Sequence, residues 1–281
     1  MQQSRPMKHI LVPTDYSDNA WNAVKYAMFL FEKVRCEIHL LHVDSSRHSS
    51  VNSSMGAALD RNAQDSEELM EALSDRVERE PLNVKHRFHY HISHNQFVDA
   101  IRAAIQEYHI DYIVMGTKGA SGFKEMTIGS HAGDVITKVK CPVLVVPEKA
   151  GNVRPNEIAF PTDFNINYKK KVLDTLIDIL QISHGSLKIV HVGQTEADLS
   201  AHQRQNKEFL ETYLGSDTDF DYHFLSSDDL ELALQHFVES RNIPMIAMIA
   251  KNLNFFQRLL FRPVVKTIGY HTHVPFLVLH E

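Results

Sequence analysis

Three glycines in the segment 114–147 have a spacing that could hold an anion. Gly116 is followed by two residues and Gly119, and nine further residues lead to the pair Gly129-Ser130. This spacing fits neither the Rossmann dinucleotide fingerprint nor the Walker A pattern. Glycine lets the backbone approach a ligand closely, and a helix that opens at Ser130 would direct free N–H groups at an anion such as phosphate.

A carboxylate and several hydrogen-bond donors accompany these glycines. Asp15 closes the first expected strand and Gly116 closes the fourth. In an open parallel sheet, ligands bind beyond the carboxyl ends of the strands, where the strand order reverses. The donors in this region are Thr117, Lys118, Ser121, Ser130 and His131. Two structural alternatives stay open: the glycines could serve only turn geometry, and Asp15 could cap the helix that follows it.

An internal repeat organises the chain. The segment 9–16 (HILVPTDY) matches 157–164 (EIAFPTDF), 38–43 (IHLLHV) matches 187–192 (LKIVHV), and 141–148 (CPVLVVPE) matches 274–281 (VPFLVLHE), in the same order. Self-similarity of this kind indicates two copies of one domain. We therefore expect a first domain over 1–148, a linker over 149–156 that contains Gly, Asn and Pro, and a second domain over 157–281.

Each copy reads as strands that alternate with helices. This alternation predicts an α/β fold: an open, Rossmann-like, five-stranded parallel sheet with helices on both faces. Short apolar runs mark the strands and 3.6-residue periodicity marks the helices, and Ser17 is the expected N-cap of the first helix. In the first copy the strands are expected at 9–14, 37–43, 83–93, 111–117 and 142–147, and the helices at 18–34, 57–80, 95–109 and from about 130. The third strand has a polar side and should lie near an edge.

The glycine pattern, ending in CPVLVVP, resembles the signature of the universal stress protein family, as do the opening HILVPTDYS and the strand LLHV. The resemblance covers nearly the whole chain as a tandem pair of domains. It implies an α/β sandwich and, where the motif is intact, bound ATP. The site residues that it implies in the first copy are Pro13, Thr14, Asp15 and Val43 with Met115 and Gly116 at the adenine and ribose end, Lys118 and Gly119 in the phosphate loop, and Gly129, Ser130, His131 and Ala132 at the phosphates.

The second copy departs from this pattern. Aligned from its end, it has Ile249, Asn252, Arg262 and Pro263 in place of Gly116, Gly119, Gly129 and Ser130. Bulky side chains replace the glycines, and proline removes a backbone donor. We expect no phosphate binding in this copy, and we expect the apolar segment 254–265 to fill the cleft or to form a contact surface.

The resemblance predicts a nucleotide-binding module in which ATP, with or without Mg²⁺, acts as a stress-response signal. It also implies that the two domains pair as an internal pseudo-dimer through their C-terminal strands, while a homodimer and an unidentified protein partner stay open. An interaction scaffold with empty clefts is one alternative. A weak ATPase is another, although Lys118 is the only cation in the glycine motif and Glu125 the only carboxylate within the loop, fewer groups than phosphoryl transfer needs.

Composition excludes other classes of protein. The net charge of −6 and pI near 6.3 argue against a nucleic-acid-binding protein. The sequence contains no apolar run of about 18 residues, so we expect no membrane span, and the first residues do not resemble a signal peptide. The two cysteines have no metal-binding spacing, which favours a reducing cytoplasm.

The chain has 18 histidines, which raises the question of a metal site. In the segment 86–94 (HRFHYHISH), His89 and His91 share one face of a strand, as in a zinc pair. Alternation on an exposed strand also explains this pattern, and we predict no metal site. His42 and His191 occupy equivalent positions of the repeat, for which we expect a structural role.

Overall fold

A computed structural model of the chain describes residues 7–44, 56–81, 83–117, 129–193, 195–227, 229–250 and 273–280, with the backbone alone at 56–64 and 231. The chain divides into two compact units, residues 1–149 and 150–281. None of the helices in the described part of the chain is long and apolar enough to cross a membrane. Each unit is an α/β sandwich around its own parallel sheet.

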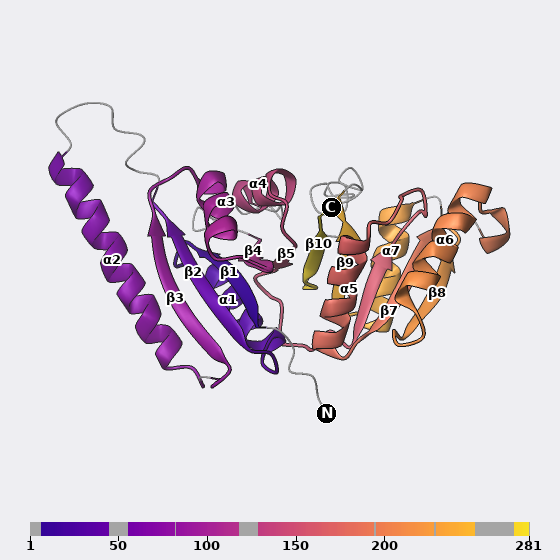
Figure 1. The fold of residues 1–281 in the computed structure, drawn as a ribbon, viewed down its shortest axis with the longest axis horizontal. Coiled ribbons are helices and arrows are strands. Elements are labelled where there is room, and N and C mark those ends of the chain that lie inside the picture. Colours follow the sequence, from indigo (N-terminus) through magenta and orange to yellow (C-terminus); the bar gives the residue numbers. More distant parts are fainter. Residues whose placement is uncertain are drawn as a thin grey trace. The chain divides into compact units, whose positions relative to one another are not determined.

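The first unit alternates strands and helices along its whole length (Figure 1). Its described elements are β1 (Lys8–Thr14), α1 (Asp18–Leu30), β2 (Cys36–Val43), α2 (Gly56–Glu78), β3 (His86–Ser93), α3 (Phe97–Glu107), β4 (Tyr112–Gly116), α4 (Ser130–Lys138) and β5 (Val143–Val146). The strand order is β3-β2-β1-β4-β5, and every pair is parallel. The order reverses between β1 and β4, which is where the sequence predicts a ligand site.

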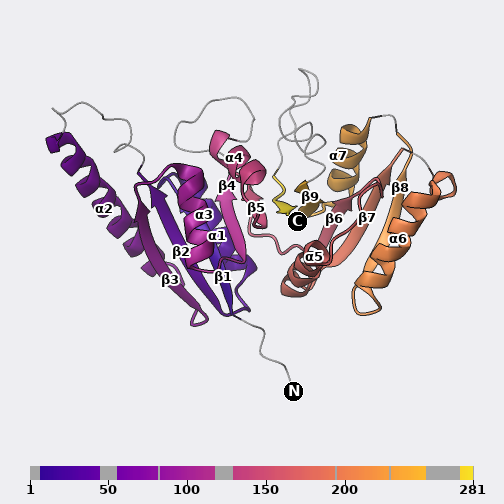
Figure 2. The same ribbon diagram turned by 45° about the horizontal axis from the view of Figure 1, so that its top comes forward.

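Right-handed crossovers place the helices in two layers. The guanidinium of Arg76 in α2 lies 4.3 Å from the ring centre of Trp21 in α1, so these two helices pack together on one face. Arg102 of α3 donates to the backbone oxygen of Lys138 at the end of α4, and α3 and α4 lie side by side in both views (Figures 1 and 2). The sheet between the layers is apolar: Ile10, Leu11 and other central strand residues are fully buried.

The second unit repeats this order. Its described elements are β6 (Glu157–Pro161), α5 (Lys170–Ser183), β7 (Ser186–Val192), a 3₁₀ turn η2 (Glu196–Asp198), α6 (Ala201–Leu214), β8 (Phe220–Leu225), α7 (Leu230–Arg241), β9 (Met245–Ile249) and β10 (Phe276–Leu279). The strand order is β10-β9-β6-β7-β8, again parallel in every pair. The predicted fold class is confirmed. The position of β3 at one edge of its sheet is also confirmed.

Candidate functional site

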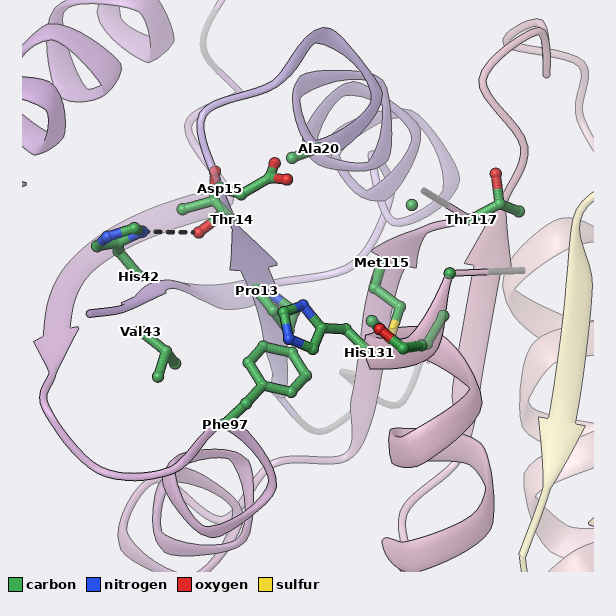
Figure 3. Close-up of a pocket in the computed structure, with 14 residues that line it drawn as sticks. Pro13, Thr14, Asp15, Ala20, His42, Val43, Phe97, Met115, Thr117 and His131 are labelled. Atoms are coloured by element: carbon green, nitrogen blue, oxygen red, sulfur yellow. Dashed lines mark hydrogen bonds between the residues drawn. The ribbon is translucent and has the colours of Figure 1, made fainter. Parts of the chain in front are cut away.

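A cavity of about 150 Å³ lies at the carboxyl ends of β1, β2 and β4 in the first unit (Figure 3). The starts of α3 and α4 complete its wall. Its lining residues are Pro13, Thr14, Asp15, Ala20, His42, Val43, Phe97, Met115, Gly116, Thr117, Gly129, Ser130, His131 and Ala132. The cavity therefore occupies the point of strand reversal.

The turn after β1 fixes the carboxylate of Asp15. Tyr16 has a left-handed φ of 63°, and Ser17 donates to Asp15 Oδ1 from both its backbone N (3.1 Å) and its Oγ (2.5 Å). Ser17 is in turn the N-cap of α1, because its Oγ accepts from the backbone N of Ala20. The predicted N-cap is confirmed. Asp15 is therefore not the cap itself: it supports the capping residue Ser17 and also lines the cavity.

The N-terminus of α4 supplies the anion-binding part of the wall. Gly129 precedes the helix and has no side chain to cap it. Its own N–H donates to the backbone oxygen of Thr117 at 2.6 Å, which joins the two ends of the segment 118–128. The next three N–H groups, at Ser130, His131 and Ala132, belong to the first helical turn, which has no earlier carbonyl to bond. With the positive end of the helix dipole, they suit a phosphate.

Aromatic rings and the half-buried His42 form further parts of the wall. The rings of Phe97 and His131 stack with their centres 4.2 Å apart, and Figure 3 shows them together below Pro13. His42 Nδ1 lies 3.0 Å from the backbone oxygen of Thr14, and its ring lies 4.5 Å from that of Tyr16. Burial, with a smaller effect of the Asp44 charge, raises the pKa of Tyr16 to about 12, so its hydroxyl is neutral at physiological pH.

Most of the residues predicted for the site meet in this cavity. Ten of them line it: Pro13, Thr14, Asp15, Val43, Met115, Gly116, Gly129, Ser130, His131 and Ala132. Lys118 and Gly119, with Ser121 and Glu125, lie outside the described residues. Thr117, which the sequence offered as a donor, also lines the cavity, and so do Ala20, His42 and Phe97, which were not predicted for the site. Phe97 begins the helix after β3, so the rule that loops at the carboxyl edge form the site could have identified it.

The equivalent edge of the second unit has the same strand pairing, within the described residues, but different side chains. Ile249 pairs with Leu279 as Gly116 pairs with Val146, and its side chain is buried. Phe164 has a left-handed φ of 57° like Tyr16 and is fully buried. Asn252, Arg262, Pro263 and the apolar segment 254–265 lie outside the described residues. In the described part, the glycine that closes β4 is thus replaced by a buried isoleucine.

The family model described as the universal stress protein family matches residues 6–147 of the chain, which is half of its length. The chain belongs to the universal stress protein family. The universal stress protein MJ0577 of Methanocaldococcus jannaschii is 28% identical to the chain in an alignment of 159 positions, which covers 50% of this chain and 96% of that relative. The match confirms the family that the glycine pattern indicated.

Solved structures of the same fold cover both units. A universal stress protein from Archaeoglobus fulgidus superposes with a TM-score of 0.69 at 20% identity, over 97% of this chain and 98% of that one. A functionally unknown protein from Pseudomonas aeruginosa has a TM-score of 0.57 at 17% identity and covers 97% of this chain and 92% of its own. At these identities the likeness concerns the fold alone.

Proposed function

We propose that the first unit of this universal stress protein binds an adenine nucleotide, ATP above all, in the cavity between β1, β4 and α4. The observation that carries the proposal is the meeting of Asp15 and the N-terminal turn of α4 in one cavity. A carboxylate that accepts hydrogen bonds suits a ribose or base, whereas a helix N-terminus suits phosphate. The two ends of a nucleotide therefore have matching groups on opposite walls.

The apolar and aromatic lining of the cavity supports a purine base as part of the ligand. Val43 and Met115 supply apolar surface, and the stacked rings of Phe97 and His131 add an aromatic one. Ligand sites of this kind combine a mostly apolar lining with a few placed polar groups. The family resemblance assigns Lys118 and Gly119 to the phosphates, and we propose that Mg²⁺ accompanies the phosphates.

We further propose that the nucleotide is a signal rather than a substrate. Among the described lining residues Asp15 is the only carboxylate, and its Oδ1 already accepts two hydrogen bonds from Ser17. Phosphoryl transfer needs a set of groups that hold Mg²⁺ and orient a nucleophile. Binding would instead tie together the ends of β1 and β4 and the start of α4, and so change the surface that a partner protein meets in a stress response.

The second unit is proposed to be a degenerate partner that does not bind the nucleotide. The buried side chain of Ile249 stands where Gly116 lies in the first unit, which removes the close approach of the backbone to a ligand that glycine permits. Its pairing with the first unit as a pseudo-dimer, a homodimer of the whole chain and a cytoplasmic location stay predictions from the family resemblance.

Mass spectrometry of the small molecules released when the purified full chain is denatured tests the proposal. We expect an adenine nucleotide in an amount that approaches one per chain, and less of it from a chain that carries a substitution in the α4 turn. Protein that releases no nucleotide, and that does not take one up when ATP is added, would instead support the alternative of an interaction scaffold.

A further inference from the structure

Four histidines and one glutamate gather on one face of the sheet in the first unit, away from the nucleotide cavity. His9 of β1 pairs in register with Glu37 of β2, and His39 of β2 pairs with His89 of β3. Because residues in register point to the same face of a sheet, and His39 is two residues after Glu37, these side chains lie together. His91 joins them two residues after His89.

Helix α3 separates this cluster from the cavity. Tyr108, the residue that caps the end of α3, stacks on His39 and His91 with ring centres 4.7 Å and 4.4 Å apart. Phe97, at the other end of the same helix, lines the cavity. The 11 residues of α3 span about 16 Å at 1.5 Å per residue, so the histidine cluster is a separate site.

The distances between the polar atoms of the cluster are those of a metal site that is nearly assembled. Glu37 Oε2 lies 3.3 Å from His89 Nε2 and 3.9 Å from His9 Nδ1. One ligand atom from each of His9, Glu37 and His39 lies within 4.8 Å of the other two. Ligand atoms at 2.0–2.1 Å from a tetrahedral ion lie about 3.3 Å apart, so small movements of the side chains would bring these atoms onto one ion.

Three nitrogens of the cluster lack hydrogen-bond partners. His9 Nδ1, His39 Nε2 and His89 Nε2 are buried, and none of them makes a hydrogen bond within the described part of the chain. Buried polar atoms of this kind are rare, because each costs the hydration that it loses. Three such nitrogens beside one carboxylate form a set of donor atoms that a metal ion would satisfy.

His91 prepares His39 for coordination. His39 Nδ1 lies 3.1 Å from His91 Nε2. When Nδ1 of His39 carries the hydrogen, it donates a hydrogen bond to His91 Nε2. The lone pair of His39 is then on Nε2, the nitrogen without a hydrogen-bond partner. Histidines that bind metals nearly always use their second nitrogen in this way, and the contact fixes both the tautomer and the direction of the ring.

We propose that His9, Glu37, His39 and His89 bind a divalent transition-metal ion, of which Zn²⁺ suits the ligands best, with His91 and Tyr108 as positioning residues. Imidazole nitrogens with one carboxylate oxygen are typical ligands of zinc in tetrahedral sites. The rings now stack with interplanar angles of 25° for His9 and His39 and 18° for His39 and His89, so coordination turns them about χ2 until their lone pairs converge. The His89 side chain is 40% exposed, which gives an ion access.

Titration of the metal-free full chain with Zn²⁺, in competition with a chromophoric chelator, tests this site. We expect one tight equivalent per chain, and a loss of affinity of at least about 10-fold in Glu37→Gln, since even supporting residues of metal sites contribute 10–100-fold. The matched control is Asp221→Asn. Asp221 Oδ2 lies 3.1 Å from His223 Nε2 in the second unit, so this pair has one histidine and one carboxylate. The Asp221→Asn variant should still bind one equivalent of Zn²⁺ tightly.

A second variant and the absorption spectrum of bound Co²⁺ complete the test. His89→Gln removes a more exposed ligand if Glu37→Gln does not fold, and it should weaken binding in the same way. Co²⁺ bound in place of Zn²⁺ should give the visible absorption of a tetrahedral ion with nitrogen and oxygen ligands. The absence of a tight equivalent would overturn the proposal. So would tight binding that survives both substitutions, because it would then come from other histidines among the 18 of the chain.

Discussion

A Cβ atom on Gly116 would lie 2.8 Å from both Cγ and Nδ2 of Asn19, and 3.1 Å from the Asn19 backbone oxygen. Asn19 is a buried residue in the first turn of α1, so the end of β4 and the start of α1 meet without room for a side chain. Because its copy in the second unit is Ile249, the repeat favours a ligand as the reason for Gly116, and the structure adds this close contact as a second reason. The two units differ at the start of the following helix, since α5 begins seven residues after Asp163, whereas α1 begins three residues after Asp15.

Gly116→Ala should therefore destabilise the ligand-free protein. Overpacking of a close contact costs about 1–3 kcal/mol, and denaturant unfolding of the nucleotide-free chain would measure it. Gly151→Ala is the matched control, because a Cβ there would meet only Val153 Cγ2 at 3.7 Å. Equal stability of Gly116→Ala and the unsubstituted chain would show that the contact with Asn19 relaxes without cost.

The backbone N–H of Ser130 should contribute to phosphate binding. Proline is tolerated at the first position of a helix, and Gly129 has a φ of −57° and a ψ of 155°, which suit a residue before proline. Ser130→Pro thus removes the N–H and the hydroxyl, whereas Ser130→Ala removes the hydroxyl alone. We expect Ser130→Pro to lose a further factor of about 10 in ATP affinity, since a hydrogen bond to a charged group contributes about 1.5–3 kcal/mol.

Adenosine affinity is the internal control for this pair of variants. A nucleoside lacks the phosphates that the α4 turn would bind, so its affinity should be the same in both. An equal ATP affinity of Ser130→Pro and Ser130→Ala, in protein with unchanged thermal unfolding, would mean that the phosphates lie elsewhere.

His42 and His191 provide a comparison between the two units. His191 Nδ1 lies 3.0 Å from the backbone oxygen of Thr162, as His42 Nδ1 does from that of Thr14, and the expected structural role accounts for both contacts. Loss of either ring should cost about 1 kcal/mol of unfolding free energy. Only His42 lines the cavity, so His42→Gln should also lower ATP affinity, whereas His191→Gln should not. Similar affinities for the two variants would contradict this assignment.

Acid should destabilise the second unit through His280. Burial lowers the pKa of this imidazole from 6.5 to about 4, so between these values the unfolded chain binds a proton that the folded chain does not. Stability is then fully present above the unfolded pKa and falls as the pH decreases through this window. Denaturant midpoints measured from about pH 7 to about pH 5 should fall less in His280→Gln than in the unsubstituted chain. Parallel curves would show that His280 is hydrated in the folded state.

The fold could be predicted from the sequence because each helix and strand has its own local signal and because the second copy repeats the signals of the first. Apolar runs such as 143–146, polar breaks and caps such as Ser17 each specify an element, and the second copy repeats the order. The site residues next to strands β1 and β4 could be predicted from the sequence for the same reason. The partners of His89 could not be predicted, since they depend on which strands are neighbours and in which register. Register is a property of the assembled sheet, and a histidine pair seen in one strand does not show the carboxylate opposite it.

Calorimetric titration of the nucleotide-free full chain with ATP tests the central claim most directly. The account predicts one binding site per chain, with Ser130→Pro weakening it and Ser130→Ala retaining most of the affinity. Absence of binding to the correctly folded chain, or two equivalent sites per chain, would contradict it.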